Sequence, residues 1–130
     1  FGLAQQHDFH LVCFVTPATT PERRAMVVEH AGGFIYYISV RGTTGERSAL
    51  PADLVSNIRE LKSLTPVPVA VGFGISRPDH ARAVVQVADG AIVGSAIVRR
   101  MWGAAQAGGD PVAAALEFIG PMAKAVKSPR

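Results

Sequence analysis

Short apolar segments alternate with longer amphipathic segments along the chain. The short segments are rich in β-branched and aromatic side chains, and none alternates cleanly between apolar and polar positions. Near-continuous apolar runs of this length are typical of parallel strands that are buried on both faces. The predicted strands span residues 9–15, 34–40, 67–71 and 90–93.

The intervening segments carry the signals of helices. Thr20 is a suitable N-cap, and Pro21 suits the first helical position because proline has no amide hydrogen to satisfy. Asp110 is a second suitable N-cap, directly before the proline that opens the last helix. The predicted helices span residues 21–30, 51–64, 78–87, 95–101 and 111 to about 126.

This alternation predicts an α/β fold with a parallel sheet and helical crossovers. We expect a single domain over residues 1–130, because residues 103–109 are typical of a turn and no linker interrupts the pattern. Four strand–helix units are too few for a closed (β/α)₈ barrel, which takes roughly 250 residues. The pattern therefore leaves two architectures open, a small doubly wound sheet or half of a barrel.

Composition narrows the class of protein. With 48% hydrophobic and 18% charged residues, the 130-residue chain has enough apolar material for one core, and no apolar stretch is long enough to cross a membrane. Cys13 is the single cysteine, which indicates a reducing, intracellular compartment, and its spacing to the four histidines predicts no metal site. The scattered basic residues of the +3 net charge favour a small anionic ligand over a nucleic acid. Because the chain begins at Phe1, we expect a piece of a longer protein.

Glycine-rich loops follow the last three predicted strands, at residues 41–47, 72–76 and 94–96. Parallel strands bring such loops to one side of the sheet, and glycine lets the backbone approach a ligand closely. The last loop runs directly into a helix at Ser95, whose first amides and positive dipole end favour an anion. One such loop alone would indicate only a tight turn. Together they predict a phosphate site of the kind that barrel enzymes carry after their last two strands.

These segments resemble the tryptophan synthase alpha chain family. The resemblance rests on residues 34–39, on Gly-Thr-Thr-Gly at 42–45, on Val-Gly-Phe-Gly-Ile-Ser at 71–76 and on residues 89–98. It implies that the chain forms strands five to eight, the C-terminal half of a (β/α)₈ TIM barrel. Four parallel strands would then carry outer helices and a short phosphate-binding helix.

The family's activity is implied by the same resemblance. Its members are cytoplasmic lyases of tryptophan biosynthesis that cleave indole-3-glycerol phosphate to indole and glyceraldehyde 3-phosphate without a cofactor. Indole then passes to a tryptophan synthase beta subunit in an alpha-beta-beta-alpha complex. Neither a nucleic acid nor a membrane is an expected partner.

The resemblance also implies roles for individual residues. Tyr36 would support the catalytic carboxylate, and Thr44 would help to close its loop over the substrate. Phe14, Tyr36 and Gly72 would line the substrate pocket, and the Ser95 hydroxyl would assist the backbone amides that hold the phosphate. The phosphate-binding residues would be Gly45, Phe73, Gly74, Gly94 and Ser95.

The acid and base that such a cleavage requires are not identifiable in this chain. Glu46 is the one carboxylate in a loop on the catalytic side, and Arg47 beside it could neutralise it. In the family both roles fall to carboxylates in the first half of the barrel, so we expect the chain alone to be inactive. Two alternatives remain, a non-catalytic phosphometabolite-binding half-barrel that dimerises and half of another sugar-phosphate barrel enzyme. Arg99 and Arg100 are expected at the far end of a short helix, with little part in binding.

Overall fold

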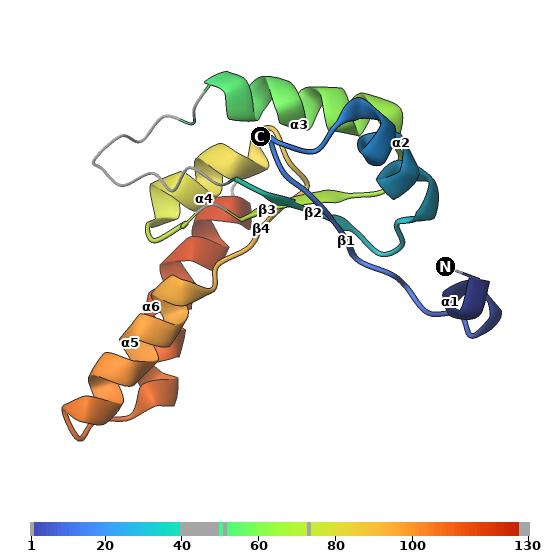
Figure 1. Ribbon diagram of the computed structural model, residues 1–130. Helices are drawn as coiled ribbons and strands as arrows, with labels where there is room; N and C mark the ends of the chain where they lie inside the picture. Colours follow the sequence, from blue (N-terminus) through green and yellow to red (C-terminus); the bar gives the residue numbers. More distant parts are fainter. Residues whose placement is uncertain (1, 40–49, 51, 73, 128–130) are drawn as a thin grey trace.

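The computed structural model describes residues 2–39, 50, 52–72 and 74–127. In this part of the chain four strands alternate with helices, and a short helix that the sequence pattern did not indicate precedes them (Figure 1). In chain order the elements are α1 (Gly2–Gln6), β1 (Cys13–Val15), α2 (Pro21–His30), β2 (Ile35–Ile38), α3 (Ala52–Leu64), β3 (Val69–Gly72), α4 (Pro78–Val85), β4 (Gly90–Ala91), α5 (Ser95–Gln106) and α6 (Pro111–Lys127).

The four strands form one parallel sheet in the order β1-β2-β3-β4. Each strand lies beside the one that follows it in the sequence, and right-handed crossovers of this kind place the connecting helices on one face. Figure 1 shows α2 and α3 over that face of the sheet. A doubly wound sheet would instead reverse its strand order and carry helices on both faces. The topology therefore confirms the half-barrel and excludes the doubly wound alternative.

The hydrophobic core fills the space between the sheet and its covering helices. Alternate strand residues point into it, and all five are almost inaccessible to solvent: Val15, Ile35, Tyr37, Val69 and Val71. Helices α3 and α4 contribute the apolar stripe that helical periodicity requires. The buried side chains of that stripe are Leu54, Ile58, Leu61, Ala81 and Val84.

The opposite face of the sheet is not covered in the same way by the described residues. Phe14, Tyr36 and Ala70 are register partners across β1, β2 and β3, and all three remain at least partly exposed. The side chain of Phe14 is 57% exposed, and its ring centroid lies 5.3 Å from that of Tyr36. The prediction of strands buried on both faces was therefore wrong for this face, because the crossover helices all lie on the other one. Cys13, in the same strand, is also only half-buried, although it lies on the core face beside Ile35.

Two helices, α2 and α6, begin directly after the capping residues that the sequence predicted. The Thr20 hydroxyl accepts a hydrogen bond from the Arg23 amide at 3.4 Å, and Pro21 occupies the first turn of α2. The Asp110 carboxylate accepts one from the Val112 amide at 2.8 Å and so caps α6. Both contacts satisfy amides that have no partner within the helix, which is why these ends could be located from the sequence.

Other boundaries differ from the prediction. β1 begins only at Cys13, and α4 ends at Val85. The largest difference is α5, which continues to Gln106, so that Trp102 and Gly103 lie inside a helix rather than in a turn. A glycine within a helix costs about 1 kcal/mol relative to alanine. Packing of α5 against α6 along its length offsets that cost (Figure 1).

The end of α5 shows where the chain actually turns. The amide of Gly108 donates to the Ala105 carbonyl at 3.1 Å, and the amide of Gly109 donates to the Ala104 carbonyl at 2.9 Å. These two bonds form a Schellman motif, in which the residue after the C-cap adopts the left-handed conformation. Gly108 has a φ of 71°, which glycine adopts without steric penalty.

Ion pairs join the helices to one another and to the sheet. Arg24 of α2, which is largely buried, pairs with Glu60 of α3 at 2.7 Å. Asp89, just before β4, accepts a hydrogen bond from the Val69 amide at 2.9 Å and pairs with Lys62 at 2.5 Å. The Asp89 carboxylate therefore links α3, β3 and β4, which is a structural role rather than a catalytic one.

Candidate phosphate-binding site

A hollow of about 240 Å³ lies where the carboxyl ends of β2, β3 and β4 meet. Five of the residues predicted for binding line it, namely Tyr36, Gly72, Gly74, Gly94 and Ser95. They come from three separate segments, which the parallel sheet brings to the edge where barrel enzymes bind their ligands. The other lining residues are Ile38, Ser39, Ile75, Ile92, Ala96 and Arg99.

Two glycines of this hollow are required by their surroundings or their backbone. A Cβ atom at residue 72 would lie 2.5 Å from the hydroxyl oxygen of Tyr36 and 2.7 Å from one of its ring carbons. Only a residue without a side chain lets the Tyr36 ring cross β3 at this point. Gly74 has a φ of 74°, which favours glycine for conformational reasons. The Tyr36 ring and the turn at Gly74 therefore shape the wall of the hollow together.

The N-terminus of α5 supplies the polar groups of the hollow. The helix begins at Ser95, and its N-cap residue, Gly94, forms no side-chain cap. The first amides of a helix have no acceptor within the helix, and the positive end of the helix dipole lies beside them. A Cβ atom at residue 94 would meet no other atom within 4 Å, so the space beside the cap is open. This arrangement suits an anion such as a phosphate group.

Arg99 is a residue of the hollow that sequence reasoning missed. It was expected at the far end of a short helix, but α5 runs on to Gln106 and places Arg99 in its second turn. Ser95 and Arg99 are four residues apart and so lie on one face of the helix. Arg99 lines the hollow as a result, which corrects the expectation. The spacing of four was a signal in the sequence that could have found it.

No carboxylate lines the hollow among the residues that the structure describes. Glu60 and Asp89 are engaged in the ion pairs of the helix layer. Asp79 lies in the first turn of α4, where hydrogen bonds from the Arg77 guanidinium lower the pKa of its carboxyl to about 2. These groups are held as structural anions, and among the described residues no carboxylate is placed at this hollow to act as a general acid or base.

Some expected site residues lie outside the described ranges. They are Thr44, Gly45 and Phe73, together with the Glu46–Arg47 pair, and their roles remain predictions. Phe14 contacts Tyr36 but is not among the residues that line the hollow, so its place in the substrate pocket also remains a prediction. Across the described ranges, no three His, Cys, Asp or Glu side chains gather as metal ligands would. None of the helices described is long and apolar enough to cross a membrane.

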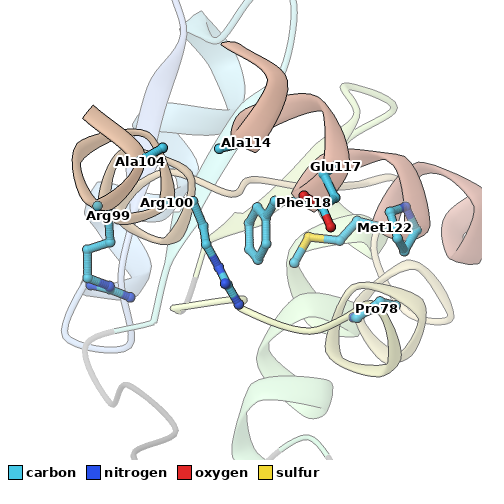
Figure 2. A pocket seen from close by; sticks show the side chains of 10 residues that line it. Pro78, Arg99, Arg100, Ala104, Ala114, Glu117, Phe118 and Met122 are labelled. Carbon is cyan, nitrogen blue, oxygen red and sulfur yellow. The ribbon is translucent and has the colours of Figure 1, made fainter. Parts of the chain in front are cut away.

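A second, larger hollow of about 600 Å³ lies between α5 and α6 and reaches Pro78 at the start of α4 (Figure 2). Its lining is mostly apolar, and the Arg100 guanidinium carbon lies 5.4 Å from the centroid of the Phe118 ring. Figure 2 shows Arg100 extending beside Phe118, whereas Arg99 leaves α5 on the side away from that ring. Arg99 borders both hollows, and Arg100 borders only this one.

Sequence comparison relates this chain to one family along its whole length. The family model described as tryptophan synthase alpha chain matches residues 2–127. The tryptophan synthase alpha chain of Rhodopirellula baltica is 46% identical over 122 residues, which are 91% of this chain and 44% of the relative. That of Caulobacter vibrioides is 44% identical over 120 residues, 92% of this chain and 44% of the relative. The chain thus spans less than half the length of these curated relatives.

Solved structures agree with the sequence comparison. The alpha subunit of tryptophan synthase from Legionella pneumophila superposes with a TM-score of 0.81 at 30% identity, over 96% of this chain and 45% of that one. The subunit from Pyrococcus furiosus gives a TM-score of 0.81 at 26% identity, over 95% and 48%. The fold described above corresponds to about half of these longer structures. With both the sequence and the fold matched from end to end, the chain belongs to the tryptophan synthase alpha chain family.

Proposed function

We propose that this chain is the phosphate-binding half of a tryptophan synthase alpha chain. The enzyme would be a cytoplasmic lyase that cleaves indole-3-glycerol phosphate to indole and glyceraldehyde 3-phosphate. The observation that carries the proposal is the hollow in which Gly72, Gly74, Gly94 and Ser95 meet at one end of the sheet. Open backbone at a helix N-terminus suits the phosphate group of such a substrate.

Each part of the hollow has a place in this proposal. The amides of Gly94 and Ser95 hold the phosphate together with Gly74, and the Ser95 hydroxyl adds a hydrogen bond. The backbone of Gly45 and Phe73 completes the phosphate-binding site, and Thr44 closes its loop over the substrate. Tyr36, with Gly72 and Phe14, faces the indole ring. The chain would supply strands five to eight of the closed barrel.

The chemistry would need the other half of the barrel. Aldol-type cleavage requires one group that protonates the indole ring carbon and another that removes a hydroxyl proton. The hollow contains no carboxylate among its described residues, so the proposal places both groups outside this chain. The chain alone would bind phosphate without releasing indole. The relatives are named alpha chains, which supports assembly of the full protein with a beta subunit that uses the indole.

Titration with sn-glycerol 3-phosphate tests the binding site. In Gly94→Asp, a carboxylate beside the helix N-terminus would repel the phosphate and fill the open space, so binding should be abolished. Ser95→Ala removes one hydrogen bond to a charged group and should weaken binding by about 1.5–3 kcal/mol. Calorimetry or chemical-shift titration measures both. If Gly94→Asp binds as tightly as the parent chain, the phosphate is held elsewhere and the proposal fails.

The exposed inner face of the sheet favours a second candidate, a non-catalytic half-barrel that binds phosphorylated metabolites and dimerises. Phe14 on that face is 57% exposed, as expected of a surface that another half covers. The two candidates differ in activity. As the phosphate-binding half of the enzyme, the chain should support release of indole from indole-3-glycerol phosphate once the N-terminal half of an alpha chain is added. The second candidate predicts no indole under those conditions.

A further inference from the structure

We propose that Arg99 is the cation that balances the charge of the bound phosphate. The inference rests on the proposed function, because it concerns the same hollow. Among the described residues that line it, Arg99 is the single one with a charged side chain. In the remaining described lining, backbone amides and hydroxyl groups can donate hydrogen bonds to an anion but do not balance its charge, and the apolar side chains do neither.

The helix geometry directs Arg99 toward the first amides of α5, at Gly94 and Ser95. Ser95 and Arg99 share one face of α5, because residues four apart lie one above the other on a helix. The Cα–Cβ bonds of a helix tilt toward its N-terminus, so a long side chain covers the turn before its own Cα. For Arg99 that turn is the one that begins at Ser95. Its guanidinium can therefore reach a group held at the first amides of the helix.

The surroundings of Arg99 leave its charge available. Within residues 2–39, 50, 52–72 and 74–127, no carboxylate forms an ion pair with it. The side chain is exposed at the mouth of the hollow, so it keeps its hydration until a ligand arrives. A guanidinium presents several donors in a fixed plane and forms short, charge-assisted hydrogen bonds to phosphate oxygens. It would add charge to a site that otherwise relies on backbone dipoles.

Arg100 is a matched control on the same helix. It has the same charge and a nearly identical distance from the helix N-terminus, but its guanidinium lies over the Phe118 ring at 5.4 Å. Figure 2 shows that the two arginines leave α5 in different directions. Arg100 does not line the smaller hollow. Any effect of general positive charge should therefore appear equally at both positions, whereas direct contact should appear only at Arg99.

The experiment compares Arg99→Gln, Arg99→Lys and Arg100→Gln with the parent chain by titration with sn-glycerol 3-phosphate at several salt concentrations. Arg99→Gln should raise Kd about tenfold or more, as expected for the loss of a charge-assisted hydrogen bond. It should also flatten the dependence of Kd on salt, a readout that a purely structural role would not move. Arg99→Lys should restore the salt dependence and part of the affinity, and Arg100→Gln should match the parent chain.

The outcomes separate this inference from the proposed function. If Arg99→Gln binds like the parent chain while Gly94→Asp loses binding, the proposed role of Arg99 is wrong, but the phosphate site at Gly94 and Ser95 is supported. Equal losses in Arg99→Gln and Arg100→Gln would show a general field effect and overturn the inference. If Gly94→Asp also binds normally, or if the parent chain does not bind at all, the proposed site itself fails.

Discussion

Tyr36 and Tyr37 are neighbours in β2, yet their side chains leave opposite faces of the sheet. Tyr37 is 1% exposed in the core, with Asn57 of α3 as its polar neighbour, and Tyr36 lines the hollow. The sequence shows apolar and aromatic residues at every position of this strand, so periodicity alone could not assign the faces. The helix layer decides which tyrosine is buried. The resemblance assigned Tyr36 to the substrate pocket, and Tyr36 does line the hollow, but its contact with a substrate stays a prediction.

The burial of Tyr37 predicts a loss of stability in alkali. Desolvation raises the pKa of its phenol above the ordinary value of 10.0, because the ionised form is disfavoured in the core. The stability that depends on the neutral phenol is therefore complete below about pH 10 and is lost as the pH rises through the raised pKa. We expect the unfolding midpoint in urea to fall as the pH rises above about 10, and to fall less in Tyr37→Phe.

Tyr36→Phe is the control for this measurement, since it changes the other tyrosine of the chain and leaves Tyr37 in place. The alkaline fall should persist in that variant. A parent chain and Tyr37→Phe with the same pH profile would show that Tyr37 does not contribute to the loss.

Elements with local signals were predictable, and elements held by packing were not. α2 runs from Pro21 to His30 as predicted, because a capping threonine and a proline define its start within the sequence itself. α5 was predicted too short, because Gly103 is a poor helix former and the compensating contact comes from α6, a separate element. Arg99 was missed for a different reason, because its four-residue spacing from Ser95, which puts both on one face of the helix, was not used.

The two glycines near the end of α5 should respond in opposite ways to alanine. Gly103 lies inside the helix, where a Cβ atom would meet nothing within 4 Å, so Gly103→Ala should stabilise the chain by about 0.5–1 kcal/mol. Gly108 also has free space, but its φ of 71° penalises a side chain. Gly108→Ala should therefore destabilise by about 1 kcal/mol. Urea unfolding at a fixed protein concentration measures both.

Since neither substitution creates a clash, the pair isolates backbone conformation from packing. Destabilisation by Gly103→Ala would mean that α5 does not continue through residue 103. Stabilisation by Gly108→Ala would mean that the turn does not need the left-handed conformation.

At the scale of the whole molecule, the sheet has helices on one face and a partly exposed apolar face on the other. The described surface on that face includes Phe14, which packs against Tyr36 with its ring tilted and is more than half exposed. Apolar surface of this kind favours association. Within the described part of the chain, the order of the strands also leaves β1 and β4 at the two edges of the sheet, each with an unpaired side. Half of a barrel wall therefore carries both an open face and open edges.

We expect the 130-residue chain to self-associate through this face. Phe14→Ser should weaken the association, because it removes the most exposed aromatic side chain of the inner face, and sedimentation velocity over a concentration series measures it. Leu64→Ser is the control, since Leu64 is 51% exposed at the end of α3 on the outer side. A parent chain that sediments as a monomer at every concentration, or equal effects of both variants, would contradict this prediction.

The hollow at the ends of β2, β3 and β4 has a consequence for how such proteins change over time. The described residues that line it, from Tyr36 to Arg99, all belong to one uninterrupted stretch of the chain. Exchange of a single gene segment could therefore transfer the anion-binding residues of the hollow from one barrel to another. The acid–base groups, if they reside in the other half, would stay behind. Recognition of the substrate's phosphate and the reaction performed on its carbon skeleton could then be inherited separately and recombined.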